Sequence, residues 1–202
     1  MRVHKKSSLC ITLGLLLLVS ALMLTGYNNL IQFKADKTSA NIFDRLMQVK
    51  EKTPEETLLY TENPNVQMPV VTVNAYECIG TLEIPSLKLK LPVMSEWDYS
   101  KLRVSPCRYT GSVYEDNLII CAHNYKNHFG KIKTLKIGDL LSFTDMNGNV
   151  FRFKVSDIET VNPHIPENIT NGNWDLTLFT CTVSGTSRVT VRCIKESNLK
   201  NR

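Results

Sequence analysis

The sequence predicts a mainly β fold, a small closed or nearly closed barrel that follows an N-terminal membrane helix. Three observations support this prediction. Short apolar runs with period-two alternation recur from residue 76 onward, helical windows are few there, and an uncharged stretch at 9–27 precedes them. At least six short strands with few helices are typical of a barrel. The 202-residue chain is 43% apolar and 21% charged, which excludes a fully disordered chain, a collagen or a coiled-coil rod.

The N-terminal apolar stretch is interpreted as an uncleaved membrane anchor. Residues 9–27 are rich in leucine and carry no charge. A helix of this length rises about 28 Å, close to the hydrocarbon thickness of a bilayer. The flank at 1–8 is basic, which places the N-terminus in the cytoplasm and the rest of the chain outside. A cleaved signal peptide is the alternative, with a small-residue cleavage site at 19–21, but the apolar run continues past that site at 22–24.

The net charge of +5 divides unevenly along the chain. Arg2, Lys5 and Lys6 contribute three positive charges before residue 9, and no charge lies in 9–27, which leaves +2 for residues 28–202. A nucleic-acid-binding protein normally keeps its basic surplus on the folded part, so this class is disfavoured and no nucleic-acid partner is expected.

Residues 28–75 are predicted to form a stalk. An amphipathic helix is expected near 37–52, because Ile42, Leu46 and Val49 recur at positions i, i+4 and i+7. The polar segment after it lacks a period and predicts an extended linker. Three prolines punctuate that linker: Pro54, Pro64 and Pro69.

The barrel is expected over residues 76–196, followed by a short tail at 197–202. A continuous apolar run at 118–121 predicts a strand buried on both faces. The dipeptide Asn147-Gly148 predicts a type I′ hairpin. In chain order, the expected strands lie at 79–84, 87–93, 118–121, 140–143, 151–155, 176–180 and 189–194.

Five of the six cysteines lie outside the anchor, an odd number that suggests one free thiol. Cys181 is the candidate for the free thiol because of its neighbours. The other four lie in or beside strand-like runs and are expected to be buried structural thiols, with disulfides as the open alternative. These four are Cys78, Cys107, Cys121 and Cys193.

Three residues have the chemistry of thiol-dependent acyl transfer, which requires a nucleophile, a proton-transfer partner and a group that stabilises negative charge. Cys181 ends one apolar strand, His123 lies two residues past the end of another, and Arg188 opens the strand after the cysteine. Neighbouring strands of a barrel can bring all three to one surface. Thr180 is expected to shape the substrate-binding site. Arg192 has the same strand parity as Arg188 and is the fallback arginine.

Two segments and one arginine give the chain a family resemblance. TLFTC at 177–181 resembles the T-L-x-T-C signature of sortases, and CAHN at 121–124 resembles their histidine segment. Residues 129–139 are similar to the segment after that histidine in the family, and Arg188 matches the family arginine. The resemblance covers about 76–195. It implies a closed sortase-type β-barrel of about eight strands with short helices.

The resemblance further implies a cysteine transpeptidase of the thiol-protease type, at the surface of a Gram-positive cell. Cys181 would cleave an LPxTG-like sorting motif in a secreted protein and hold the acyl fragment as a thioester. His123 would protonate the leaving amine and deprotonate the incoming one, and Arg188 would stabilise the oxyanion or position the substrate. The acceptor would be an amine of peptidoglycan or a pilin lysine. The enzyme would be a single-pass membrane protein that contacts lipid through residues 9–27.

Smaller features bear on the subclass. The residues around Cys181 are most similar to class D, with class B second. The segment at 157–175 is shorter than the class B insertion, although a helix at 37–52 resembles class B. No Asp-Pro-aromatic lid occurs in 28–75, which argues against class C.

Three other functions stay open at this point. They are a membrane-anchored cysteine protease that only hydrolyses, a scaffold that binds sorting motifs without turnover, and a zinc-stabilised module. The zinc module would use Cys121, His123, Cys181 and Cys193, whose spacing is poor for zinc. No cofactor or metal is expected. Only the adjacent pair Glu115-Asp116 raises calcium dependence, and such pairs usually face solvent.

Overall fold

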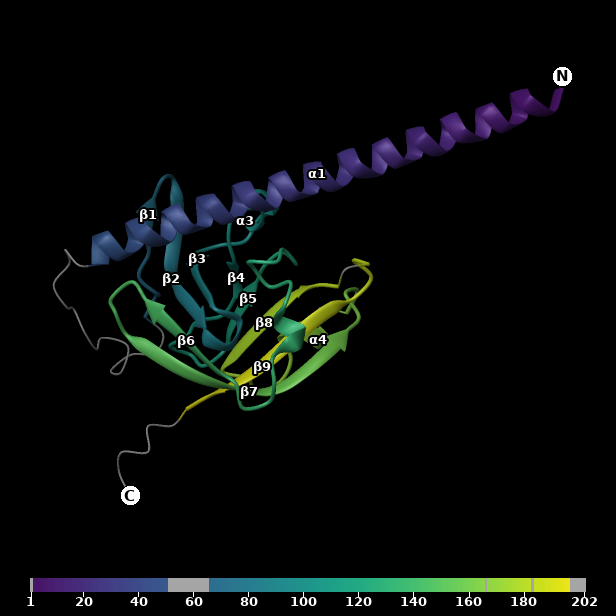
Figure 1. Cartoon of the computed structure of the whole chain (residues 1–202). Coiled ribbons are helices and arrows are strands. Elements are labelled where there is room, and N and C mark those ends of the chain that lie inside the picture. The colour runs from purple at the N-terminus through teal and green to yellow at the C-terminus, as the bar shows by residue number, and fades with distance from the viewer. Residues whose placement is uncertain (1, 51–65, 166, 183, 197–202) are drawn as a thin grey trace.

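A computed structural model describes residues 2–50, 66–165, 167–182 and 184–196. It consists of one long helix, α1 (Arg2–Lys50), and a β-barrel. The C-terminal half of α1 lies along the barrel, and the N-terminal half projects away from it (Figure 1). The expected tail at 197–202 lies outside the described residues.

The barrel is a ring of eight strands. The order is β1-β2-β3-β4-β5-β8-β9-β7-β6, and a further pairing of β2 with β6 closes the ring, with β1 attached to the outside of β2. The β3–β4 and β5–β8 pairs are parallel, and all others are antiparallel. The predicted closed barrel of about eight strands is therefore confirmed. The strands are β1 (Val71–Val73), β2 (Tyr76–Ile84), β3 (Leu89–Met94), β4 (Cys107–Thr110), β5 (Leu118–Cys121), β6 (Leu140–Asp145), β7 (Val150–Val161), β8 (Leu176–Cys181) and β9 (Arg188–Lys195).

Alternating side chains fill the barrel interior. Phe151, Phe153 and Val155 of β7 point inward and alternate with exposed or half-exposed neighbours. Val189 and Val191 of β9 also belong to the core, although Thr190 and Arg192 beside them are buried too, on the other face of the strand. Strand β5 is buried along its whole length, as its continuous apolar run predicts. Each fully buried large apolar side chain contributes roughly 1.5–3 kcal/mol to the stability of the fold. The core therefore holds the strand ends, and the loops that leave them, in fixed positions.

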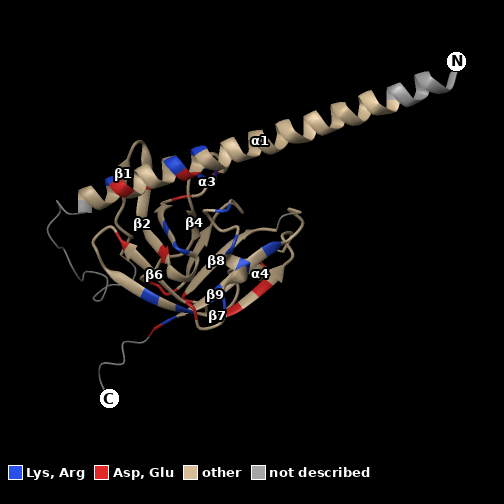
Figure 2. Cartoon of the chain, in the orientation of Figure 1, with Lys and Arg blue, Asp and Glu red and all other residues tan. Residues whose placement is uncertain are grey.

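Helix α1 joins two segments that were expected to be separate, the anchor at 9–27 and the helix near 37–52. Neither glycine nor proline occurs between residues 28 and 36, so nothing interrupts the backbone hydrogen bonds there. Part of α1 is long and apolar enough to cross a membrane. Between residues 10 and 49 its charged residues lie only in the part beside the barrel (Figure 2), and the sequence before residue 9 is basic.

The second half of α1 packs on the barrel and is not a free stalk. Ile42 and Leu46 are fully buried there, as the expected apolar stripe requires, whereas Val49 is exposed. These two side chains join a cluster outside the barrel ring that includes Cys78 and Phe179. The amphipathic pattern of this segment is therefore explained by its contact with the β-barrel.

The barrel unit also begins earlier than residue 76. Met68 packs in the core, and β1 pairs with β2 through a two-residue turn, Asn74-Ala75, in which both residues have positive φ. Alanine is unusual in such a turn, so no sequence signal marked it. The linker prolines Pro54 and Pro64 lie outside the described residues.

Short helices connect the strands, and two sequence expectations are wrong in detail. Leu87 lies in a 3₁₀ turn and not in the strand, because Pro85 starts η1 (Pro85–Leu87). The hairpin at Asn147-Gly148 exists, but only the glycine has positive φ, so its turn is not type I′. The other short helices are α3 (Tyr99–Leu102), η2 (Ile132–Thr134) and α4 (Glu167–Thr170).

Candidate active site

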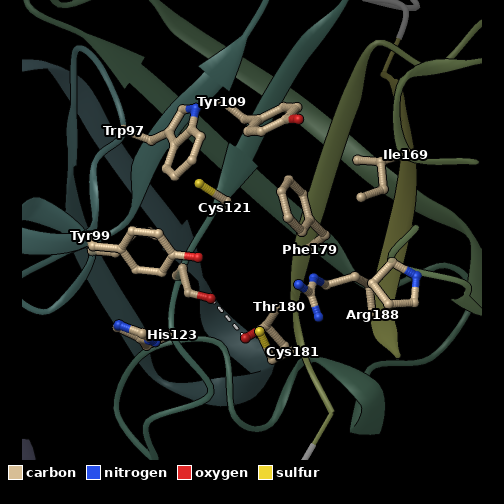
Figure 3. A pocket seen from close by; sticks show the side chains of 13 residues that line it. Trp97, Tyr99, Tyr109, Cys121, His123, Ile169, Phe179, Thr180, Cys181 and Arg188 are labelled. Atoms are coloured by element: carbon tan, nitrogen blue, oxygen red, sulfur yellow. Dashed lines mark hydrogen bonds between the residues drawn. The ribbon is translucent and has the colours of Figure 1, made fainter. Parts of the chain in front are cut away.

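A groove of about 220 Å³ lies on the outer face of the barrel, where β5, β8 and β9 meet. It contains all three residues of the predicted catalytic set. Figure 3 shows Cys181 between His123 on one side and the guanidinium of Arg188 on the other. The groove is lined by Trp97, Tyr99, Leu102, Tyr109, Cys121, Ala122, His123, Pro163, Ile169, Phe179, Thr180, Cys181 and Arg188.

Cys181 is the last residue of β8 and the only residue of that strand that is partly exposed rather than buried. β8 pairs with β5 on one side as far as Phe179 and with β9 on the other side up to Cys181 itself, so the strand is held from both flanks and its last residue is held by β9. The hydroxyl of Thr180 donates a 2.8 Å hydrogen bond to the carbonyl of Ala122 (Figure 3). Thr180 therefore ties the end of the cysteine strand to the residue before His123.

His123 follows β5 in a loop that returns across the groove. Its ring stacks on Tyr125, with centroids 4.9 Å apart. The Asn124 side chain also donates to the carbonyl of Thr182, the residue after the cysteine. The pKa of His123 is lowered below 6.5, first by burial and then by the positive charge of Arg103. The imidazole is therefore neutral at pH 7 and can accept a proton.

Arg188 opens β9 directly opposite Cys181 in the antiparallel pair. Its Nη1 donates to the carbonyls of Gly185 and Ser187, at 3.4 and 3.3 Å. These two bonds satisfy only part of its five N–H donors. The guanidinium thus lies in the groove with donors that a negatively charged oxygen can use.

Arg192, the fallback residue, lies on the same face of β9 but outside the groove. Its side chain is only 3% exposed and forms an ion pair with Glu159 at 2.8 Å. It also donates to the carbonyls of Asn168 and Ile169 and to the hydroxyl of Thr177. These partners hold α4 against the barrel, so Arg192 supports the groove wall and Arg188 is the arginine inside it.

An aromatic wall was not predicted from the sequence. The rings of Trp97 and Tyr109 are 5.8 Å apart, and Tyr109 meets Phe179 edge-on at 5.2 Å. Tyr99 stands beside them and is 72% exposed. The only sequence signal was the presence of two aromatic residues, at 97 and 99, in a loop. Such a wall suits apolar side chains of an extended peptide.

Cys121 also faces the groove, a second thiol that the sequence did not assign to the site. It is buried, and burial raises its pKa to about 12. Burial also raises the pKa of Cys78 and of Cys193 to about 12, and raises that of Cys107. All six cysteines are free, and these four are buried, as expected. Cys181 is the groove thiol that solvent and substrate can reach.

The described residues contain no group of three or more His, Cys, Asp or Glu side chains placed to hold a metal ion. Cys193 lies inside the barrel core, separate from the groove, so the zinc module is not supported. Of the acidic pair, Asp116 forms an ion pair with Lys195 at 2.6 Å and Glu115 accepts from Asn117. Neither contact builds a calcium site.

Comparison with known proteins identifies the family. Residues 82–196, more than half of the chain, match the model of the Sortase domain, and the chain belongs to the sortase family. No curated protein sequence matches it.

Solved sortase structures share the fold. A sortase D5 transpeptidase of Clostridium perfringens is 19% identical, with a TM-score of 0.57, and the match covers 81% of this chain and 99% of that one. Sortase A of Corynebacterium diphtheriae is 16% identical, with a TM-score of 0.53, covering 89% and 98%. Sortase C1 of Streptococcus suis is 24% identical, with a TM-score of 0.51, covering 61% and 75%.

Proposed function

We propose that this sortase is a membrane-anchored cysteine transpeptidase that cleaves an LPxTG-like motif in secreted proteins and transfers the acyl fragment to a cell-wall amine. The observation that carries the proposal is the groove in which Cys181 faces Arg188 across two paired strand ends, with His123 beside them. Membership of the sortase family supports the same reaction class.

The first half-reaction forms a thioester. The sulfur of Cys181 attacks the carbonyl carbon of the scissile peptide bond, and the resulting oxyanion accepts hydrogen bonds from Arg188. His123 takes the thiol proton and delivers it to the leaving amine as the carbon–nitrogen bond breaks. The departing peptide leaves with a neutral amine, and the acyl fragment stays on sulfur.

The second half-reaction reverses these roles. An incoming amine attacks the thioester carbon, and His123 accepts the proton that the amine loses. The carbon–sulfur bond breaks, and the thiolate of Cys181 is regenerated and reprotonated. The lowered pKa of His123 suits this cycle because the ring starts each half-reaction neutral.

The groove shape supports a peptide substrate. The wall formed by Trp97, Tyr109 and Phe179 offers an apolar surface, while Arg188 offers donors at the other side. Apolar residues of a sorting motif would pack on the wall, and the reacting carbonyl would then lie between cysteine and arginine. Excluding water from this space favours amine attack over hydrolysis.

The membrane location also belongs to the proposal. Helix α1 is long and apolar enough to span a bilayer, and the basic flank before residue 9 favours a cytoplasmic N-terminus. The barrel would then face the cell wall, where both secreted substrates and amine acceptors occur. The acceptor would be a peptidoglycan amine or a pilin lysine.

The test uses the full chain in detergent micelles with a panel of quenched sorting-motif peptides, each with and without an amine acceptor. We expect at least one peptide to give an amine-ligated product, and Cys181→Ala to abolish it. Cys10→Ala is the matched control, because Cys10 lies in the membrane helix.

Three outcomes would contradict the proposal. Turnover that persists in Cys181→Ala would remove the assigned nucleophile. Hydrolysed product despite excess amine would identify a protease, and peptide binding without turnover of any peptide would identify a scaffold.

A further inference from the structure

Helix α1 touches the loop that bears His123. The side-chain oxygen of Gln32 accepts a 3.3 Å hydrogen bond from the backbone N–H of Lys126. One turn further, Oδ2 of Asp36 accepts a 2.6 Å bond from the side-chain amide of Asn127. Both bonds join residues more than 90 positions apart, so they exist only because the helix lies against the barrel.

These two bonds lie where α1 leaves its apolar segment. Leu30 and Phe33 are largely exposed, whereas Ala35 and Ser39 are buried against the barrel. Along the described part of α1, Gln32 makes the first tertiary hydrogen bond after the apolar segment. The membrane-proximal contact of the anchor helix is thus with the histidine loop.

Packed side chains within the loop connect this contact with the imidazole of His123. His128, next to Asn127, is fully buried, and its ring lies 5.4 Å from that of Tyr125, which in turn stacks on His123. The backbone N–H of His128 donates to Tyr125, and that of Phe129 donates to His123. The turn is compact, and a shift of Asn127 therefore moves the stacked rings together.

Close packing of the turn makes it rigid. A Cβ atom at Gly130 would lie 2.6 Å from the carbonyl oxygen of Asn124 and 2.7 Å from that of Tyr125. No larger residue fits there without displacing the loop backbone. The turn is therefore expected to move as one body, and its orientation depends on what holds its outer edge.

Among the residues that the structure describes, no other hydrogen bond or ion pair joins this loop to α1. A cavity of about 470 Å³ separates α1 from β3 and the loop, and Asp36, Lys126, Asn127 and His128 are among its lining residues. Open space rather than packed side chains therefore lies beside the hydrogen bond between Asp36 and Asn127. Packing contacts on that side would not compensate for the loss of this bond.

We propose that Gln32 and Asp36 are positioning residues that orient His123 through the loop at 123–131, so that the anchor helix is a working part of the catalytic site. This inference rests on the proton-transfer role proposed for His123. Neither residue touches the groove, and both act through Asn127, His128 and Tyr125. Displacement of a catalytic group by about 1 Å is enough to cost roughly 100-fold in rate.

The pKa of His123 reports directly on the position of its ring. Burial and Arg103 both lower its pKa. A loosened loop would expose the ring and move it from Arg103, so its pKa would rise toward 6.5. The charged and titratable groups around the ring are Tyr125, His128, Arg103, Cys181 and Arg188.

The experiment compares variants of the full chain in detergent micelles. Asp36→Ala and Gln32→Ala each remove one acceptor, and Asp36→Asn keeps an oxygen that Asn127 can reach. Asp44→Ala removes the same charge further along α1, and Asn41→Ala removes a helix-to-barrel bond, to Asn74, away from the loop. The two readouts are NMR titration of the His123 ring and kcat and KM for a turned-over peptide.

We expect Asp36→Ala to raise the His123 pKa and to lower kcat by roughly 10- to 100-fold with KM unchanged, since the effect is on the transition state. The double variant, Gln32→Ala with Asp36→Ala, should lose more activity than either single variant. Asp36→Asn should keep most of the wild-type activity, and the controls Asp44→Ala and Asn41→Ala should match the wild type. Gln32→Ala is the milder variant, which tests the proposal even if Asp36→Ala does not fold.

The proposal is overturned if the His123 titration of the double variant, or of Gln32→Ala where the double variant does not fold, coincides with that of the wild type. It is also overturned if Asn41→Ala moves the titration equally, since the effect would then be general loosening. The titration needs no turnover. A wild type that processes no peptide would therefore contradict the proposed function, while the titration still decides the role of Gln32 and Asp36.

Discussion

Cys181 and Arg188 are register partners at the last position of the antiparallel β8–β9 pair. Side chains at paired positions project to the same face of a sheet, about 4.5–5.5 Å apart at Cβ. The pairing therefore fixes the Cβ atoms of the two residues relative to each other and places the thiol and the guanidinium on the same face of the sheet.

Arg188→Ala should lower kcat/KM by about 100- to 1,000-fold, the usual loss when one oxyanion donor is removed. Arg188→Lys should recover only part of it, because an ammonium lacks the planar fork of donors. Steady-state kinetics on a quenched peptide measure both. A wild-type rate for Arg188→Ala, with a large loss for Arg192→Ala at unchanged stability, would reverse the assignment of the two arginines.

Arg192→Ala should act on stability. The substitution leaves Glu159 and three oxygen acceptors without their buried donor, which costs roughly 3–5 kcal/mol by analogy with broken buried ion pairs, and somewhat less here because Glu159 is 40% exposed. Denaturant unfolding of the full chain in micelles measures the loss. An unchanged midpoint would show that Arg192 does not hold α4 in place.

Thiol alkylation should single out Cys181. In a Cys10→Ala background, iodoacetamide at pH 8 should modify Cys181 first, because the other thiols are buried and burial raises the pKa of Cys121 to about 12. Peptide mass spectrometry locates the label. Early labelling of Cys121 would mean that the groove opens further than the structure indicates.

Acid should destabilise the protein through His128. Burial, with a smaller contribution from His123, lowers the pKa of His128 from 6.5 to about 4. Between about pH 6.5 and pH 4, His128 therefore binds a proton in the unfolded chain but stays neutral in the folded chain. Stability is full above about pH 6.5 and falls as the pH approaches 4, with about 2 kcal/mol lost at pH 5.

The measurement for His128 is the free energy of unfolding at pH 7.5 and at pH 5, for the wild type and for His128→Phe. The phenylalanine ring fills a similar space and carries no titrating nitrogen. We expect the variant to lose less stability than the wild type between the two pH values. Equal losses would assign the acid sensitivity to other groups.

Much of the barrel was predictable because its strands bury one face or both. The alternation in β7 and the continuous run in β5 follow directly from that burial, whereas β9 is buried on both faces and its apolar residues alternate with Thr190 and Arg192. β1 and β4 were missed because they have only three and four residues, too few to show a period. The continuity of α1 was missed because residues 28–36 carry neither the uncharged apolar run nor the amphipathic stripe that predicted the two helical segments.

The candidate catalytic residues were predictable from residue type and local motif, but the choice between Arg188 and Arg192 was not. Both side chains project from the same face of β9, and alternation cannot separate residues of equal parity. The carbonyls of residues 168 and 169 cover Arg192, and they come from a connection more than 20 positions away.

The sequence by itself predicted the long apolar N-terminal segment, the β-rich domain and the candidate set Cys181, His123 and Arg188, because each prediction depends on local composition or short-range pattern. Only the tertiary structure decided the aromatic wall of the groove, the burial of Cys121 and the hold of α1 on the histidine loop. These features depend on contacts between segments distant in sequence, and such contacts form only when the barrel closes and the helix packs against it.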